Sequence, residues 1–340
     1  MFLVKRLLVL SAWSVLVLVT RQAAAQPFHF PTSNHALLDP DGGDRFFAGT
    51  VGRSWTSGMF GCVRTDGRQI HEGIDIKCVR RDQHGEPIDD IKATADGSVV
   101  YFNTKPALSN YGKYLILQHR IDGLDIYSCY AHLKEISPTI TNGKRVKAGE
   151  TIGIMGRTAN TREGISKERA HVHFELNLLV NEHFPAWYEK TYPNQRNDHA
   201  EWNGQNLIGI DPRLILLAQA QPGNAFSLLH FIRDQTELCR VMVLDTHFPW
   251  LRRYARLIKR NPLAEREGVA GYEIALNYNG LPFKLTPRAP SEVHGQLKVQ
   301  LLSVNEEELR KHPCRHLVTR RGDQWELAAA GRRLVELIVF

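Results

Sequence analysis

The chain has 340 residues, of which 43% are hydrophobic, 9% aromatic and 23% charged, so it contains enough apolar material for a sizeable core. This composition excludes a disordered chain, a collagen-like repeat and a small disulfide scaffold, and the length indicates about two domains. The formal net charge of +7 suggests a nucleic-acid partner, but the N-terminal segment changes that balance.

Residues 1–25 have the pattern of a secretory signal peptide. Lys5 and Arg6 precede an apolar run of 13 residues, Leu7–Val19, and small residues at 23–25 offer a cleavage site. Because the run is shorter than the roughly 20 residues of a membrane-spanning helix, we expect cleavage, with an uncleaved anchor as the alternative.

Cleavage would leave 40 basic and 36 acidic residues, a net charge of +4. This near balance argues against a nucleic-acid partner. No later segment is long and apolar enough to cross a bilayer. We therefore expect an exported protein, periplasmic or extracellular, with no stable membrane insertion after cleavage.

Five cysteines follow the signal segment: Cys62, Cys78, Cys129, Cys239 and Cys314. None forms a Cys-x-x-Cys pair, so a thiolate zinc site is not indicated. Export places the chain in an oxidising compartment, and an odd number leaves at least one thiol unpaired. We expect a Cys62–Cys78 bridge that closes a loop of about 17 residues, with two free thiols as the alternative.

Between Phe47 and Leu179 the pattern is that of short strands. The candidates are Gly97–Phe102, Tyr114–Gln118, Leu124–Tyr130, Thr151–Met155 and His171–Leu176. Asp122-Gly123 and Asn142-Gly143 are tight-turn signals between them. We predict a mainly β fold, with a compact, mostly antiparallel domain here, followed by an irregular surface segment over 182–206.

The pattern changes after Asp211-Pro212. Apolar residues at helical spacing predict a basic helix over 249–260, whose arginines would face carboxylates of a partner. A hairpin is predicted around Asn279-Gly280, and further strands over 296–304 and 325–340. We therefore predict three parts: the signal (1–25), a first domain (26–211, core 47–180) and a smaller, β-rich α+β accessory domain (212–340).

The first group with metal-binding chemistry is His71 and Asp75. On a straight strand they would lie about 13 Å apart, but Gly73 between them permits a bend that brings imidazole and carboxylate together. Imidazole plus carboxylate suits zinc. A solvated loop is the alternative for this spacing alone.

Three further histidines lie in the same predicted domain. Strand alternation places His171 and His173 on one face, about 6.6 Å apart along the backbone. His132 ends the strand that contains Tyr130. Each histidine alone is more often structural, but all lie at strand ends or turns, where functional groups collect.

Together these motifs resemble the LytM/lysostaphin-type zinc endopeptidases, which cleave peptide bonds in bacterial cell walls. The matching text is His71-x-x-x-Asp75, the Tyr-Ala-His-Leu around His132, the His-x-His of His171 and His173, and the turn at 146–153. The resemblance covers roughly residues 61–175, about a third of the chain, and does not extend to the C-terminal part.

The resemblance implies a role for each residue. His71, Asp75 and His173 would be the ligands of one zinc ion per chain, with a fourth position open to water. His132 and His171 would be the catalytic pair: one would take a proton from the water, and the other would stabilise the oxyanion and assist the leaving amine. The sequence does not distinguish these two roles. Glu72 matches no catalytic position and is expected to be structural or exposed.

The function that the resemblance implies is an exported zinc metallopeptidase that hydrolyses the stem-peptide cross-links of peptidoglycan. One alternative is a non-enzymatic scaffold that activates a cell-wall amidase, although such relatives lack ligands that this chain retains. Another is a zinc peptidase with a substrate outside the wall.

Overall fold

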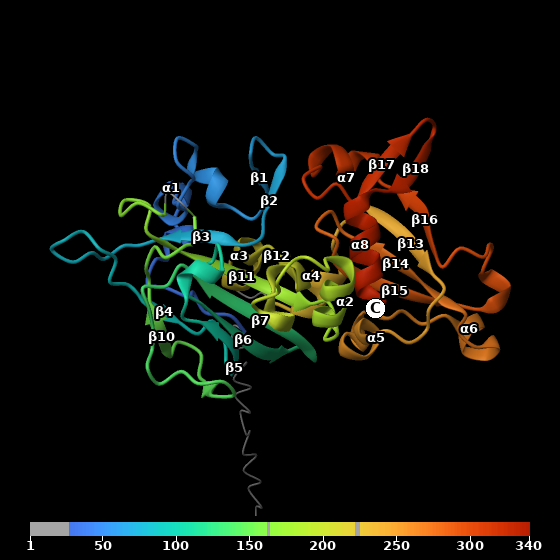
Figure 1. Cartoon of the computed structure of the whole chain (residues 1–340), viewed down its shortest axis with the longest axis horizontal. Coiled ribbons are helices and arrows are strands. Elements are labelled where there is room, and N and C mark those ends of the chain that lie inside the picture. The colour runs from blue at the N-terminus through green and yellow to red at the C-terminus, as the bar shows by residue number, and fades with distance from the viewer. Residues whose placement is uncertain (1–26, 162–163, 222–224) are drawn as a thin grey trace, which may run out of the picture.

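The computed structural model describes residues 27–161, 164–221 and 225–340. The predicted signal peptide lies outside these residues. Figure 1 shows two halves, an N-terminal one built around a large sheet and a C-terminal one with its own smaller sheet. This confirms the predicted fold class, a β-rich chain with a smaller α+β region at its C-terminal end.

The N-terminal half contains twelve strands among the described residues: β1 Gly61–Arg64, β2 Gln69–His71, β3 Ile74–Lys77, β4 Asp90–Lys92, β5 Gly97–Asn103, β6 Tyr114–Ile121, β7 Leu124–Ala131, β8 Glu135–Ile136, β9 Arg145–Val146, β10 Thr151–Ile154, β11 His171–Leu179 and β12 Leu207–Ile210. Its helices are short: η1 Ala36–Leu38, α1 Gly43–Phe46, η2 Trp55–Gly58, η3 Pro106–Leu108, α2 Phe184–Thr191, η4 Ala200–Trp202 and η5 Gly204–Asn206. All five strands predicted from the sequence are present.

The largest sheet of the described chain has seven strands, in the order β12-β11-β7-β6-β5-β9, with β3 also paired to β11. Every pairing in it is antiparallel, as predicted. The β6–β7 hairpin turns at Asp122 and Gly123, whose φ angles of 50° and 73° suit a two-residue turn. Strand β11 is buried along its whole length, which makes it the centre of this half.

The C-terminal half mixes helices and strands: α3 Pro212–Ala220, α4 Leu228–Arg233, β13 Cys239–Val243, α5 Pro249–Arg253, η6 Ala255–Leu257, α6 Pro262–Glu267, β14 Gly271–Leu276, β15 Pro282–Arg288, η7 Pro290–Glu292, β16 Val299–Val304, α7 Glu306–Lys311, β17 Val318–Arg321, β18 Gln324–Leu327 and α8 Ala329–Ile338. A four-stranded sheet in the order β15-β14-β13-β16 contains the predicted hairpin around Asn279-Gly280.

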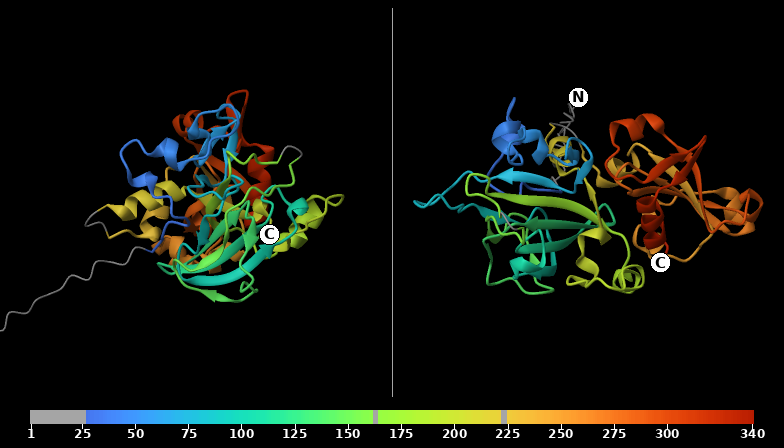
Figure 2. Two further views of the ribbon diagram at one scale, coloured as in Figure 1. Left: turned by 90° about the vertical axis from the view of Figure 1, so that its left-hand side faces the viewer. Right: turned by 45° about the horizontal axis from the view of Figure 1, so that its top comes forward.

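The two halves share one hydrophobic core, which runs from Phe28 to Ile338. Helix α3 begins at the N-cap Asp211, whose carboxylate accepts hydrogen bonds from the first turn. This helix contacts β11 and η1 of the N-terminal half. Figure 2 shows the halves side by side, with α8 at the boundary between them. The predicted boundary near residue 211 thus marks a change of sequence pattern, while the hydrophobic core continues across it.

Three local predictions, for segments 325–340, 182–206 and 249–260, are wrong. Most of segment 325–340, predicted as a strand, forms helix α8, because Leu334, Val335, Leu337 and Ile338 recur at helical spacing and are buried. The segment 182–206 is not irregular throughout, since α2 buries Trp187 against the core.

The predicted basic helix over 249–260 is also wrong. Helix α5 ends at Arg253, and the chain becomes extended at Ile258, which forms a parallel bridge with Leu285 at the edge of the second sheet. Arg252 and Arg253 both pair with Glu182, so the two guanidinium charges share one carboxylate within the chain.

The disulfide links Cys62 to Cys314, which are 252 positions apart, and Cys78 is free. The predicted Cys62–Cys78 bridge is therefore wrong. The bridge joins the β1–β2 hairpin of the first half to the loop before β17 in the second. Cys129 and Cys239 are buried free thiols.

We expect the free energy of unfolding of the Cys62→Ser/Cys314→Ser double variant to be about 2–4 kcal/mol lower than that of wild type. Without the disulfide a long loop is no longer closed in the unfolded chain, which stabilises the unfolded state. Urea denaturation measures this loss, with Cys78→Ser as the matched control that removes a thiol and no bridge. A Cys62–Cys78 peptide in a non-reducing digest would contradict the assignment.

Within the described ranges, none of the helices combines the length and the apolar character that crossing a bilayer requires.

Candidate metal centre

The centre forms where three strands are in register. On one side of β11, His173 lies directly opposite Asp75 of β3, and on the other side it lies opposite Ala131 of β7. His132 follows Ala131 immediately. Cross-strand partners have neighbouring side chains, so the pairing places Asp75 beside His173. His132, just beyond the end of β7, joins them, with its ring centroid 6.0 Å from that of His173.

His71 reaches the same point from the end of β2. The chain bends at Gly73, as predicted, and there it passes close to β11. A Cβ added at Gly73 would lie 2.4 Å from the carbonyl oxygen of Phe174. Glycine is therefore required by the close approach of the two backbones.

Three potential ligand atoms converge, all of them from buried residues. His71 Nε2 lies 3.1 Å from Asp75 Oδ1 and 3.1 Å from His173 Nδ1, and His173 Nδ1 lies 3.0 Å from Asp75 Oδ1. The sequence predicted these three residues as one group, and the structure brings them together.

The outer hydrogen bonds of the two imidazoles orient their lone pairs. His71 Nδ1 lies 2.7 Å from the carbonyl oxygen of Met59, which only accepts, so its N–H points there and Nε2 offers a lone pair. His173 Nε2 lies 2.7 Å from Glu175 Oε1, so Nδ1 offers its lone pair. Both free nitrogens face Asp75.

The charges within the group favour a bound cation. Burial opposes ionisation of Asp75, but the surrounding imidazoles, His71 foremost, hold the pKa of its carboxyl well below the usual value. Burial also opposes a charge on His173, yet its bonds to Asp75 and Glu175 raise its pKa to about 10. Without a metal, a proton on His173 thus lies between the ligand atoms; once it is released, two nitrogen lone pairs and a carboxylate oxygen face one another and attract a cation. This donor set fits zinc, which binds imidazole and carboxylate with three protein ligands at catalytic sites.

Arg64 of β1 also reaches the group, although no sequence pattern indicated it. Its Nη2 lies 2.6 Å from Asp75 Oδ2 and 2.9 Å from His71 Nε2. A guanidinium and a metal ion would compete for the same lone pair of His71. Arg64 must therefore move away from His71 when a metal binds, while its bond to Asp75 Oδ2 can persist.

Glu175 is a buried carboxylate that sequence reasoning missed. Besides His173 it accepts hydrogen bonds from Tyr111 and from Asn177, the latter over 2.6 Å. Tyr111 also stacks on the His173 ring, with centroids 5.3 Å apart. The signal was present in the alternation His171, His173, Glu175, which continues one polar face along an otherwise apolar strand.

Replacement of Glu175 by Gln is expected to weaken zinc binding about 10- to 100-fold, because a carboxylate on the outer nitrogen fixes the ring and raises its basicity. Competition against a chromophoric chelator measures the affinity, and Glu189→Gln, an exposed change of the same kind, is the matched control. Equal affinities in the two variants would show that Glu175 does not support the ligand.

His132 and His171 lie beside the three ligand atoms, with ring centroids 5.0 Å apart. His132 Nδ1 is 2.8 Å from the carbonyl oxygen of Thr158, and His171 Nδ1 is 2.6 Å from that of Arg169. Each ring therefore has its N–H at Nδ1 and a lone pair at Nε2. The backbone of His132 has a φ of 62°, a conformation that is costly for this residue type and is found mostly where a site requires it.

Both imidazoles are neutral near pH 7. Burial, reinforced by the neighbouring His171 and His173, lowers the pKa of His132 to about 3. Burial also lowers the pKa of His171, although Asp75 opposes this effect. A neutral imidazole with a free Nε2 can accept a proton and then donate it.

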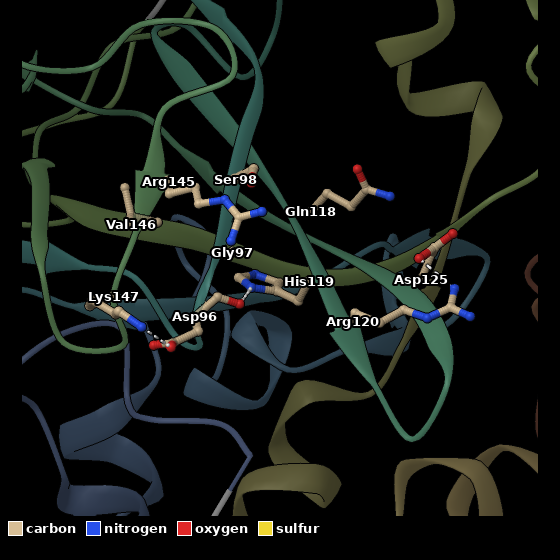
Figure 3. A pocket seen from close by; sticks show the side chains of 10 residues that line it. All are labelled: Asp96, Gly97, Ser98, Gln118, His119, Arg120, Asp125, Arg145, Val146 and Lys147. Carbon is tan, nitrogen blue, oxygen red and sulfur yellow. Dashed lines mark hydrogen bonds and ion pairs between the residues drawn. The ribbon is translucent and has the colours of Figure 1, made fainter.

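A cleft of about 610 Å³ borders this centre through Glu72 and Tyr111 and extends to the C-terminal half. Glu72, predicted to be structural or exposed, is a partly buried residue of its wall. Another cavity, of about 400 Å³, lies at the far end of β5 and β6, and Figure 3 shows its ion pair between Lys147 and Asp96. No residue of the metal centre lines that second cavity.

Comparison with known proteins places this site in context. Residues 69–184 match the model of Peptidase family M23. Among curated proteins none matches the chain.

Solved structures similar to the chain include a zinc-containing peptidase from Vibrio cholerae, with 26% identity over 32% of this chain and 26% of that one, and a TM-score of 0.23. The catalytic domain of lysostaphin from Staphylococcus simulans has 24% identity over 35% of this chain and 74% of its own, with a TM-score of 0.25. LytU has 29% identity over 35% and 69%, with a TM-score of 0.26. The chain thus spans about a quarter of the Vibrio peptidase and most of the two shorter ones.

Proposed function

We propose, from the premise that residues 69–184 form an M23 peptidase domain, that this protein is a zinc metallopeptidase acting on the peptide cross-links of bacterial peptidoglycan. The observation that supports this most is the convergence of His71, Asp75 and His173, with the neutral imidazoles of His132 and His171 beside them. A scaffold that only activates another enzyme would not need this complete set.

His71, Asp75 and His173 would hold the zinc through Nε2, a carboxylate oxygen and Nδ1. When bound, such an ion supplies Lewis-acid chemistry, which acidifies a water molecule and polarises a scissile carbonyl. Glu175 and Met59 keep the two imidazoles oriented, since each accepts the outer N–H of a ligand ring.

His132 and His171 would handle protons at Nε2. One would accept the proton of the attacking water at Nε2. That same proton, shared between the two rings, would then stabilise the oxyanion and pass to the leaving amine, so no proton beyond that of the water is needed. The carbonyls of Thr158 and Arg169 fix both rings through Nδ1, so neither ring can turn away without losing a hydrogen bond.

The location that we propose is outside the cytoplasm, in the periplasm or the medium. A disulfide between distant residues suits an oxidising compartment, and peptidoglycan lies in the same place. Cleavage of the predicted signal at 1–25 would deliver the chain there.

Digestion of purified peptidoglycan, with products mapped by mass spectrometry, tests the function. Wild-type protein is expected to release products with newly freed amino groups, and neither chelator-treated protein nor Asp75→Ala should do so. Release of such products only when a separate amidase is added would favour the scaffold. Cleavage of unrelated peptides with intact peptidoglycan left untouched would favour a substrate outside the wall.

A further inference from the structure

The cleft beside the metal centre has walls from both halves of the molecule. Glu72 and Tyr111 lie on the side of the centre, whereas Arg315, Leu334 and Arg333 come from the C-terminal half. In Figure 1 the β1–β2 hairpin and α8 lie on opposite sides of the boundary between the halves. The C-terminal residues fall outside the segment 69–184 that matches the peptidase family, so the family match does not extend to this wall.

The disulfide holds one of these residues next to the centre. Cys62 lies opposite Ile70 in the β1–β2 hairpin, and the next pair in register is Gly61 with His71, one of the proposed ligands. Cys314, bonded to Cys62, directly precedes Arg315, and its N–H points at Cys62 Sγ over 3.3 Å. Arg315 is therefore covalently linked to the hairpin that positions His71.

The guanidinium of Arg315 is incompletely satisfied. Its Nε is buried and has no hydrogen-bond partner within the described residues. Glu72 is close enough to act on it electrostatically, but the two form no ion pair among the described residues. Burial lowers the pKa of the Arg315 guanidinium, and Glu72 opposes this effect. A buried donor without a partner is costly, and a ligand that supplied an acceptor would remove that cost.

A second cation lies on the same wall. Arg333 belongs to the first half of α8, is exposed and also lines the cleft. Carboxylates are matched well by arginine, whose planar fork can donate two parallel hydrogen bonds. The two arginines thus form a basic wall facing the residues that border the metal centre.

We propose that Arg315, assisted by Arg333, binds a carboxylate of the substrate, so that the C-terminal half selects acidic peptides for the metal centre. This inference rests on the proposed peptidase function and narrows its substrate class to peptides with a free carboxylate near the scissile bond. Arg315 is a binding residue in this scheme.

The test uses cross-linked peptide fragments released from peptidoglycan by a glycosidase, in native form and after amidation of their carboxyl groups. Wild-type protein should cleave the native fragments with about 10- to 100-fold higher kcat/KM than the amidated ones, the range for a charged hydrogen bond. Arg315→Gln should lower kcat/KM for native fragments most of the way to the amidated level, with the small remaining preference supplied by Arg333. Arg321→Gln, an exposed change on β17, is the matched control and should behave as wild type.

Two further variants keep the test valid if Arg315→Gln does not fold. Arg315→Lys retains the charge and should keep part of the preference for native fragments. Arg333→Gln is exposed, so it should fold, and it should lose a smaller share of that preference. Equal cleavage of both fragment sets by wild type and all arginine variants would overturn the inference while leaving the peptidase function intact.

Binding measured by calorimetry in His171→Ala protein, which should not consume the fragments, separates the two proposals. Carboxylate-dependent binding that Arg315→Gln abolishes, without cleavage by wild type, would support the inference and contradict the peptidase function. If native and amidated fragments bind with equal affinity, the inference is overturned whatever the cleavage result.

Discussion

Replacement of His132 or His171 by alanine is expected to lower kcat about 10²- to 10⁴-fold while one zinc stays bound, because proton transfer by a positioned side chain contributes this much. Neither His132 nor His171 contributes one of the three converging ligand atoms. Each has its N–H at Nδ1 bound to a backbone carbonyl, which leaves Nε2 free for the reaction. The neutral state of both rings near pH 7 follows from their burial.

Steady-state kinetics on peptidoglycan fragments, together with the zinc content of each variant, measure this effect. His84→Ala, which removes an exposed imidazole outside the centre, is the matched control and should retain full activity. His171 Nε2 lies only 3.5 Å from Asp75 Oδ2, so the alternative assignment is a real one. If His171→Ala released zinc as readily as His173→Ala, His171 would be a ligand and our division of the pair would be wrong.

Replacement of His71 or Asp75 by alanine is expected to lower zinc affinity by more than about 100-fold, above the range for residues that only support a ligand. Removing Asp75 eliminates the only carboxylate of the group and also the partner of Arg64, which would leave a cation pointing at the remaining imidazoles. Activity should be lost in both variants, in contrast to the His132 and His171 variants, which keep the metal.

Zinc content after gel filtration, measured by mass spectrometry, checks this prediction. Asp90→Ala, on the separate three-stranded sheet, removes a carboxylate outside the centre and serves as control. Circular dichroism confirms that each variant is folded. A folded His71→Ala protein with full zinc content would remove His71 from the ligand set.

The metal centre was predictable because its residues lie in short motifs on strands with clear alternation. His71 and Asp75 are four positions apart, and His171 and His173 share a face through the strand period of two. The antiparallel register then requires the motifs to meet, since His173 pairs with Asp75 on one side and with Ala131 on the other.

Features that depend on distant contacts were not predictable. The partner of Cys62 lies 252 positions away, and spacing favoured the near cysteine over the true one. Arg64 and Arg315 look like ordinary surface charges in the sequence, because only the folded chain directs them at the centre and the cleft. Segment 325–340 was predicted as one strand because it begins with residues of β18, although Leu334, Val335, Leu337 and Ile338 have helical spacing.

The basic segment 249–260 is not the part of the C-terminal half that we expect to contact the substrate. Arg252 and Arg253 share Glu182, and Arg260 pairs with Glu265, so three arginines of this segment already have a carboxylate partner within the chain. The shared core and the disulfide also make this half part of the structure around the cleft. A protein shortened near Asp211 would lose that support as well as any substrate contact.

The zinc content of the purified wild-type protein tests the central claim most directly. Folded protein, with its disulfide intact, should contain one zinc per chain, lose it together with activity on dialysis against a strong chelator, and regain both when zinc is restored. Correctly folded protein that binds no stoichiometric zinc at micromolar concentrations of the ion would contradict the metallopeptidase and favour a non-enzymatic scaffold.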